Sequence, residues 1–266
     1  MGSGMKYNYM KGEELTAELL AELDKDVMNL PSNLAFIGRC KRGTINLACA
    51  KTGVGKSWFL MQLAAVLSLS NPVLYVSLEN DVGTDLERVL MLRDVYKGCI
   101  GKNFVYTRLN VWELEVYRND CDLLTYFDYI IIDGMDYVVD AGMDKSFDAY
   151  KDLLHSIQDR FPRASVWLSW QMGRKFETGE PSIEDIAFSY AAARMAYSAV
   201  AVYINKEERL VKSIKNRGAK SDVTAHMEWG KDFRIEQPKR MVWNALELNG
   251  EVESGHKKLP RQYQLV

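Results

Sequence analysis

Short apolar runs alternate with longer helix-forming segments over most of this 266-residue chain, and few folds accommodate that pattern. A strand followed by a helix and then another strand is typical of a parallel sheet with crossover helices. Because the runs are apolar without interruption, we expect both faces of each strand to be covered. The predicted strands are residues 44–49, 73–77, 103–107, 128–132 and 164–169.

The pattern changes after residue 198, where shorter apolar segments are separated by Asn, Gly and charged residues. These segments are expected to be antiparallel strands that extend the sheet: SAVAVYI, RLVKSI, VTAHMEW and MVWNALEL. The predicted fold class is therefore α/β, with a mostly parallel central sheet, helices on both faces and antiparallel strands at the C-terminal end. The length suits one such domain, predicted over residues 34–249.

The two ends of the chain differ from this domain. Residues 1–4 (MGSG) are interpreted as a cloning remnant, and residues 12–27 as an amphipathic helix within an N-terminal segment, residues 1–33. The leucines of that helix share one face, which packs either on its own domain or on a neighbouring subunit. Residues 250–266 form a polar tail.

Charge and composition exclude several classes of protein. With 34 Lys and Arg against 36 Asp and Glu, the net charge is -2, so a nucleic-acid-binding surface would have to be a local patch. The four Cys and three His are scattered without metal-site spacing, which argues against zinc and favours a reduced compartment. The sequence contains no apolar stretch of membrane-spanning length and no signal-peptide pattern, so we expect a cytoplasmic protein without membrane contact.

The strongest local motif has the G-x-x-x-x-G-K-[ST] pattern of a phosphate-binding loop, with Ala in the first position. It follows a predicted strand and opens a predicted helix, Trp58 to Leu67, so backbone N–H groups would converge on one anion-sized space. The candidate nucleotide-binding residues are Ala50, Lys51, Thr52, Gly53, Val54, Gly55, Lys56 and Ser57.

Two residues of this loop, and two acidic residues outside it, have expected roles in ATP hydrolysis. Lys56 is expected to contact the β- and γ-phosphates of ATP, and the Ser57 hydroxyl to hold Mg²⁺. Asp133 ends the apolar run YIII, the place of a Walker B acid that holds the magnesium shell. Gly134 follows it, so the base that activates water must lie elsewhere, and Glu79 after the second strand is the candidate. A helix-capping role is the alternative for Glu79.

Three further residues could respond to the γ-phosphate. Gln171 follows the predicted strand VWLS, where an amide could sense that phosphate. Lys215 and Arg217 lie two residues apart at a predicted strand end, with both side chains on one face. Such a pair could clamp a transition-state phosphate, in this subunit's site or the next subunit's. A solvated basic strand end is the alternative interpretation.

Taken together, six motifs resemble the motor domain of DnaB-like replicative helicases, especially those of tailed phages. The motifs span about residues 35 to 237 and read AKTGVGKS, VSLEN with Arg88 beyond it, YIIIDGMD, VWLSWQMGR, SIEDIAFS and VKSIKNRG. Ala in the first loop position is usual in that family. The resemblance implies a RecA-like P-loop NTPase core, with Glu79 as catalytic base, Gln171 as γ-phosphate sensor, and Lys215 and Arg217 as fingers in a neighbour's ATP site.

The resemblance also implies ATP and Mg²⁺ as ligands, six-membered rings of identical subunits, movement along single-stranded DNA, and a primase or loader as a possible partner. If the chain is phage-encoded, it would act in the cytoplasm of the bacterial host. Where many family members carry charged DNA contacts, this chain has Ala187, Phe188 and Tyr190. Arg174 and Lys175, after Gln171, are the candidate DNA contacts instead.

The leading hypothesis from the sequence is an ATP-hydrolysing DNA helicase motor that acts in replication. A recombination or strand-annealing ATPase on the same fold is the first alternative. The second is a regulatory or loader subunit that binds ATP and whose fingers complete a partner's site. The fold alone does not choose among them, because RecA-like domains host many functions.

Overall fold

The computed structural model describes residues 27–28, 30, 32–80, 82–95, 103–109, 126–135, 138, 146–173, 179–186, 190–206, 208–217, 221–222 and 224–227. The predicted N-terminal helix up to residue 26, the segment MVWNALEL, the C-terminal tail and the candidate DNA contacts Arg174 and Lys175 lie outside these residues. In the described part of the chain, no helix is both long and apolar enough to cross a membrane.

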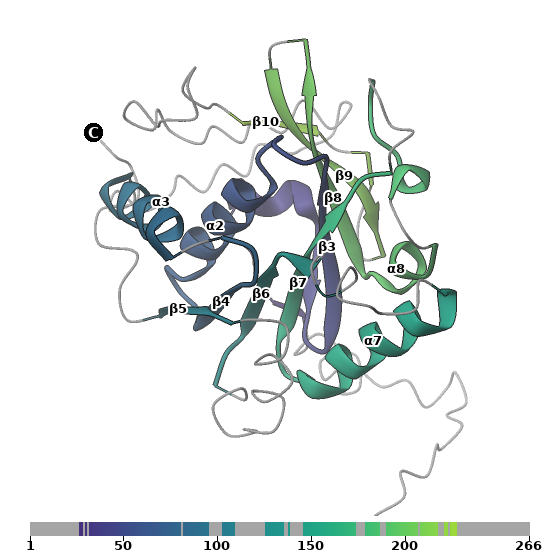
Figure 1. Ribbon diagram of the computed structural model, residues 1–266, viewed down its shortest axis with the longest axis horizontal. Coiled ribbons are helices and arrows are strands. Elements are labelled where there is room, and N and C mark those ends of the chain that lie inside the picture. Colours follow the sequence, from purple (N-terminus) through teal and green to yellow (C-terminus); the bar gives the residue numbers. More distant parts are fainter. Residues whose placement is uncertain are drawn as a thin grey trace, which may run out of the picture.

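The centre of the molecule is an eight-stranded sheet in the order β10-β9-β8-β3-β7-β6-β4-β5 (Figure 1). From β8 to β5 all neighbouring strands run parallel, whereas β9 is antiparallel to both β8 and β10. The strands are β3 (Thr44–Ala50), β4 (Val73–Ser77), β5 (Phe104–Arg108), β6 (Tyr129–Asp133), β7 (Ser165–Gln171), β8 (Ser198–Asn205), β9 (Glu208–Asn216) and β10 (Thr224–Met227).

Helices cover both faces of this sheet. In Figure 1, α2 (Lys56–Leu67) and α3 (Val82–Val95) lie on one side, and α7 (Phe147–Arg160) and α8 (Tyr190–Met195) on the other. Short 3₁₀ helices η2 (Ser32–Ile37) and η3 (Ile183–Asp185) and a two-stranded sheet of β1 (Val27–Met28) and β2 (Cys40–Lys41) complete the described elements. The predicted α/β class with a mostly parallel sheet is thus confirmed.

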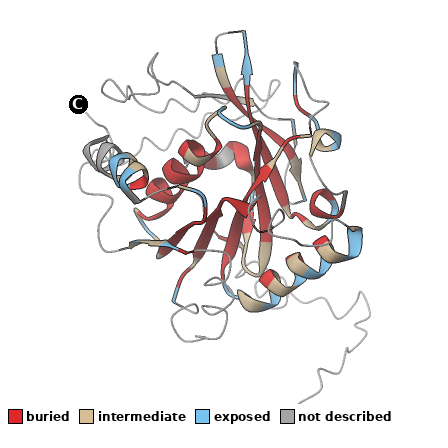
Figure 2. Cartoon of the chain, viewed as in Figure 1, coloured by how far each residue is buried: buried red, intermediate tan, exposed pale blue. Residues whose placement is uncertain are grey.

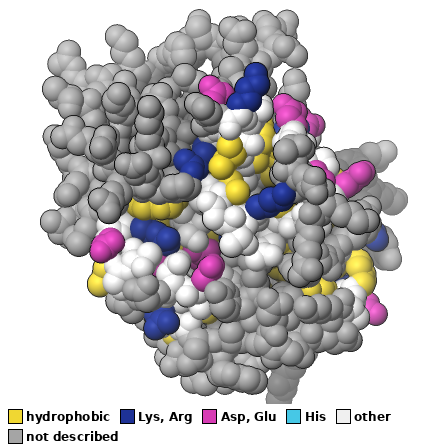
Figure 3. All heavy atoms as spheres, turned by 45° about the horizontal axis from the view of Figure 1, so that its top comes forward, with side chains coloured by type: hydrophobic (Ala, Val, Ile, Leu, Met, Phe, Trp, Pro, Cys, Tyr) yellow, Lys and Arg dark blue, Asp and Glu magenta, His cyan; other side chains and the backbone are white. Residues whose placement is uncertain are grey.

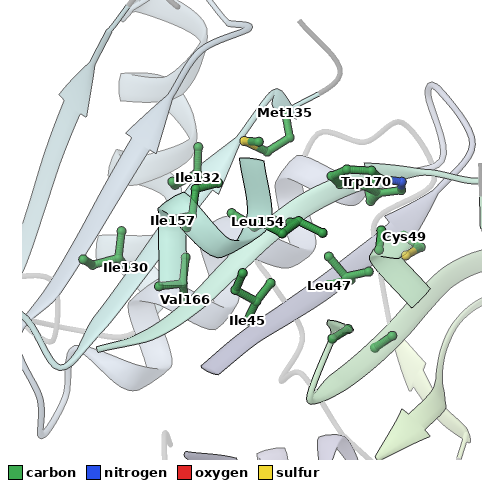
Figure 4. Packing of buried hydrophobic residues seen from close by; sticks show 14 of the residues in the cluster. Ile45, Leu47, Cys49, Ile130, Ile132, Met135, Leu154, Ile157, Val166 and Trp170 are labelled. Atoms are coloured by element: carbon green, nitrogen blue, oxygen red, sulfur yellow. The ribbon is translucent and has the colours of Figure 1, made fainter. Parts of the chain in front are cut away.

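Two hydrophobic cores result from the alternation of side chains along the strands. In β6, Tyr129 and Ile131 belong to the core under α2, whereas Ile130 and Ile132 belong to the core under α7. Figure 4 shows the second core, where strand residues meet Leu154 and Ile157 of α7.

The two covering helices are buried to different extents. Nearly every residue of α2 is buried, while α7 buries Tyr150, Leu154 and Ile157 along one stripe (Figure 2). The spacing of those three residues is that of one face of a helix, and the Ser146 hydroxyl caps α7 by accepting from the Ala149 amide at 3.2 Å. Strands that are apolar without interruption predict a sheet covered on both faces, and the apolar helix α2 covers one of them.

The predicted strands match the observed ones to within one or two residues. The largest difference is in β7, which continues to Gln171 instead of ending at residue 169. Its pairing with β3 explains the extension, because Ala50 is still in register with Gln171. Gln171 is therefore the last residue of the strand, whereas it was expected to follow it.

Candidate active site at the carboxyl edge of the parallel sheet

The segment between β3 and α2 is a tight turn that depends on two glycines. Gly53 has a φ of 78° and Gly55 a φ of 113°, a region that other residues rarely adopt. Gly55 is the N-cap of α2 and has no side chain with which to cap it. The first amides of α2 are thus not capped by this residue, and a helix start of this kind favours an anion.

The lysine and the hydroxyl of the motif open α2. Lys56 is its first residue and is 9% exposed, and Ser57 follows it, half-buried. The loop residues before them, Thr52 and Gly53, are exposed. This arrangement combines an exposed loop, a helix start and a cation that is largely shielded from water.

Asp133 ends β6 and is completely buried. Its Oδ2 accepts a 2.9 Å hydrogen bond from the Tyr75 hydroxyl on β4, whereas its Oδ1 has no hydrogen-bond partner among the described residues. A buried carboxylate oxygen without a partner is costly. A Mg²⁺ ion or a water of its hydration shell would satisfy it, so Asp133 fits the predicted role.

Glu79 lies directly beside Asp133. Leu78 donates its amide to the Asp133 carbonyl at 2.8 Å. Gly134 has a φ of 97°, and a Cβ added there would lie 2.9 Å from the Glu79 nitrogen and 3.0 Å from its Cβ. Gly134 is thus a close-approach glycine that admits the Glu79 backbone, and it leaves the Glu79 residue exposed at the edge.

Gln171 and the phosphate-loop motif are on neighbouring strands. Gln171 pairs with Ala50, and Met172 donates its amide to the Ala50 carbonyl at 3.0 Å. Gly173 in turn donates its amide to the carbonyl of Asp185, the last residue of η3, at 2.6 Å. The candidate DNA contacts Arg174 and Lys175 come directly after Gly173 in the sequence and lie outside the described residues.

Lys215 and Arg217 lie elsewhere in the chain. Arg217 donates its amide to the Tyr197 carbonyl at 3.0 Å, just before β8 starts, and Ser198 pairs with Asn46 near the start of β3. Ala50 is four residues further along β3, about 13 Å. The pair is thus near the amino end of the parallel strands, and the chain does not bring it to its own phosphate-loop motif.

Carbonyl groups at the end of α8 hold this pair of cations. Lys215 Nζ donates to the carbonyls of Ala193 at 2.5 Å and Arg194 at 2.9 Å, and Arg217 Nη2 also donates to Arg194 O. Both side chains therefore point the same way, as their spacing predicts. Burial, together with the nearby Arg217 guanidinium, lowers the pKa of Lys215 to about 8.

Two residues that the motifs did not identify also contact this edge. Tyr75 donates to Asp133, and the Ser169 hydroxyl accepts the amides of Gly134 at 2.7 Å and Met135 at 3.1 Å. Each lies within an apolar run, VLYVS or VWLS, and was counted only as part of a strand. In each case the sequence showed only a hydroxyl group within a strand predicted to be buried. The group that bonds to this hydroxyl depends on the register between strands.

Charged side chains are separated from one another on one face of the molecule (Figure 3). On the face seen in Figure 3, separate Lys and Arg side chains alternate with uncharged surface, with Asp and Glu nearby. Among the residues that the structure describes, no three His, Cys, Asp or Glu side chains group as a metal site. The arrangement fits a nucleotide-bound Mg²⁺, which usually takes only one or two carboxylates from the protein.

The fold and this edge define an α/β protein whose central sheet is mostly parallel and which carries a strand, a glycine loop and a helix at the carboxyl edge. No model of a known protein family matches the chain, and no curated protein matches it.

Proposed function

We propose that this chain is a RecA-like, ATP-driven helicase motor of the DnaB-like type, which hydrolyses ATP at subunit interfaces and moves along single-stranded DNA in replication. One observation carries the proposal: β3, β4, β6 and β7 end at the same edge and bring together the phosphate-loop motif, Glu79, Asp133 and Gln171. In open parallel sheets, ligands bind at this edge.

In this proposal the ATP phosphates lie against the loop and the first turn of α2. The backbone amides and the Lys56 ammonium bind the phosphate oxygens. Ser57 and the Oδ1 of Asp133, which has no hydrogen-bond partner among the described residues, would hold Mg²⁺ or its waters. When bound, the metal neutralises charge that develops on the phosphate oxygens.

Hydrolysis then requires a base and a charge clamp. Glu79 takes a proton from water while the water oxygen bonds to the γ-phosphorus, and the bond from that phosphorus to the bridging oxygen of ADP breaks. The products are ADP and inorganic phosphate. Gln171 contacts the γ-phosphate and reports its loss to the loop that follows β7.

The missing clamp comes from a neighbour. Lys215 and Arg217 lie near the amino end of the parallel strands, bonded to α8, so in this proposal they complete the site of the next subunit. A closed ring of identical subunits satisfies this requirement for every site. Single-stranded DNA would then contact the loops after β7, with Arg174 and Lys175 as candidates, and a primase or loader would be an external partner.

ATP hydrolysis by the purified chain, with and without single-stranded DNA and over a series of protein concentrations, tests the proposal. We expect strong stimulation by DNA and turnover per subunit that rises cooperatively with protein concentration. Turnover that is flat in both variables would contradict a ring motor and favour the regulatory or loader subunit. Filaments and DNA-stimulated turnover without unwinding of a forked duplex would favour the recombination ATPase.

A further inference from the structure

The carboxylate of Asp133 is held by one protein group within the described residues. Both Asp133 and Tyr75 are completely buried, and the phenol donates to Oδ2 at 2.9 Å while Oδ1 is unpaired. One oxygen is thus satisfied by the protein and the other is left for a ligand. A carboxylate bonded at one oxygen has far less freedom to rotate, so the direction of Oδ1 is defined.

Strand register brings the phenol to this position. Tyr75 is opposite Ile131 in the parallel pair of β4 and β6, and its side chain lies in the core under α2, as that of Ile131 does. Asp133 is two residues beyond Ile131 and therefore faces the same way, toward the helix that the phosphate-loop motif opens. A tyrosine is long enough to reach a diagonal neighbour on an adjacent strand.

The ring of Tyr75 is itself held in place. It stacks on Phe104 and Tyr106 of β5, with centroid distances of 6.5 Å and 6.1 Å. The Tyr106 hydroxyl donates to the buried Asp85 on α3 at 3.0 Å, and Arg88 also bonds Asp85 at 3.0 Å. Stacked rings with a bonded neighbour leave the Tyr75 phenol little freedom to move.

We propose that Tyr75 is a positioning residue for the metal site: its hydroxyl holds Asp133 so that Oδ1 points at Mg²⁺ or a water bound to it. This inference rests on the proposed ATPase function. Hydrogen-bond partners of ligating carboxylates typically change metal affinity or activity by 10- to 100-fold when they are removed.

The test compares Tyr75→Phe with Tyr129→Phe. Tyr129 on β6 is also completely buried, and its hydroxyl has no hydrogen-bond partner among the described residues. Tyr129→Phe is therefore a matched control, which removes a buried hydroxyl that does not bond Asp133. Binding of a fluorescent ATP analogue is measured in EDTA and over a Mg²⁺ series, and Mn²⁺ binding by electron paramagnetic resonance. We expect Tyr75→Phe to need about 10-fold more Mg²⁺ than wild type, with unchanged binding in EDTA, and Tyr129→Phe to resemble wild type.

Each outcome decides the inference. Equal Mg²⁺ requirements in Tyr75→Phe and Tyr129→Phe overturn it, while absence of Mg²⁺-dependent nucleotide binding in the wild type overturns the proposed function as well. If Tyr75→Phe does not fold, Tyr75→Phe with Asp133→Asn is prepared, because the amide removes the buried charge that the phenol stabilises. Recovery of the fold in the double variant supports the pairing, and a double variant that stays unfolded overturns it.

Discussion

The carboxyl edge of the sheet and the Lys215–Arg217 pair are built in contrasting ways. At the edge, Asp133 and Glu79 adjoin one another because β4 and β6 are in register and Gly134 admits the Glu79 backbone. The cation pair is instead bonded to α8 carbonyls near the amino end of β3. One chain thus assembles the acids of the proposed site and keeps Lys215 and Arg217 away from them.

This difference teaches how the work would be divided between subunits. The groups that would need a fixed geometry relative to the phosphates lie at the ends of strands of one sheet, β3, β7, β6 and β4. In the proposed ring, the cations that would respond to transition-state charge lie at the end of β9, away from the phosphate-loop motif of their own subunit. A subunit alone would then bind nucleotide but turn it over slowly, and the variants below test whether that division holds.

Arg217→Ala should have the largest effect. We expect DNA-stimulated turnover to fall by about 10³-fold or more, because a finger of this kind stabilises transition-state charge. Nucleotide binding should be nearly unchanged. Steady-state hydrolysis and binding of a fluorescent ATP analogue measure the two quantities, and Arg163→Ala, an exposed arginine before β7, is the control.

Mixing variants decides whether the finger acts between subunits. Arg217→Ala retains Glu79, and Glu79→Gln retains Arg217, so about a quarter of the interfaces in a randomly mixed ring combine both intact groups. We expect turnover in the mixture although each variant alone is inactive. A mixture as inactive as its components would show that Arg217 does not act in the site of a neighbouring subunit.

Glu79→Gln should lower turnover by about 10³-fold, within the range for loss of a general base, while ATP binding persists. Glu87→Gln, an exposed carboxylate nearby on α3, is the control for the change of charge. Single-turnover hydrolysis with prebound ATP separates the chemical step from binding. Normal turnover in Glu79→Gln would show that Glu79 does not activate water at the carboxyl edge.

Gly134→Ala tests the close approach on which the edge depends. Gly134 and Gly179 both have positive φ, but only at Gly134 would a new Cβ meet other atoms, the nearest at 2.9 Å. Both substitutions should cost about 1–3 kcal/mol of stability from backbone strain. Gly134→Ala should cost about 1–3 kcal/mol more from overpacking and should also lower turnover by displacing Glu79. Urea unfolding of the two variants provides the comparison.

The smallest expected effect is a pH dependence at the cation pair. Lys215 has its pKa lowered from 10.5 to about 8 by burial and Arg217, so between these values the unfolded chain holds a proton that the folded chain has lost. Stability relative to Lys215→Gln should therefore rise from pH 8 to pH 10. Urea unfolding at both pH values measures it, with Lys151→Gln, exposed on α7, as the control. A fall or no change would contradict the half-buried, hydrogen-bonded position of Lys215.

Much of the fold was predictable, and the reason is local. The strands from residue 44 to residue 171 were predicted to within one or two residues because apolar runs of β-forming residues have few other stable environments. Gly53 and Gly55 of the predicted phosphate-binding loop both have positive φ, which glycine adopts readily. The proposed roles of the site residues remain predictions.

Contacts between strands could not be predicted in the same way. Tyr75, within VLYVS, gave no sign that its hydroxyl would meet Asp133, which is 58 positions later in the chain. The same holds for Ser169 and the amide of Gly134. Such contacts depend on which strands are neighbours and in what register, and a shift of one residue would turn each side chain to the other face.

The amino-acid order was sufficient for the α/β class, the parallel arrangement and the candidate residues at strand ends, because these follow from periodicity and backbone preferences that act over a few residues. The folded chain was needed to show that, among the described residues, Asp133 has one bonded oxygen and one without a partner. It was also needed to show that Glu79 adjoins Gly134 and that Lys215 and Arg217 bond to α8. The physical reason is that burial and hydrogen bonding depend on groups far apart in sequence, which only the order and register of the strands bring into contact.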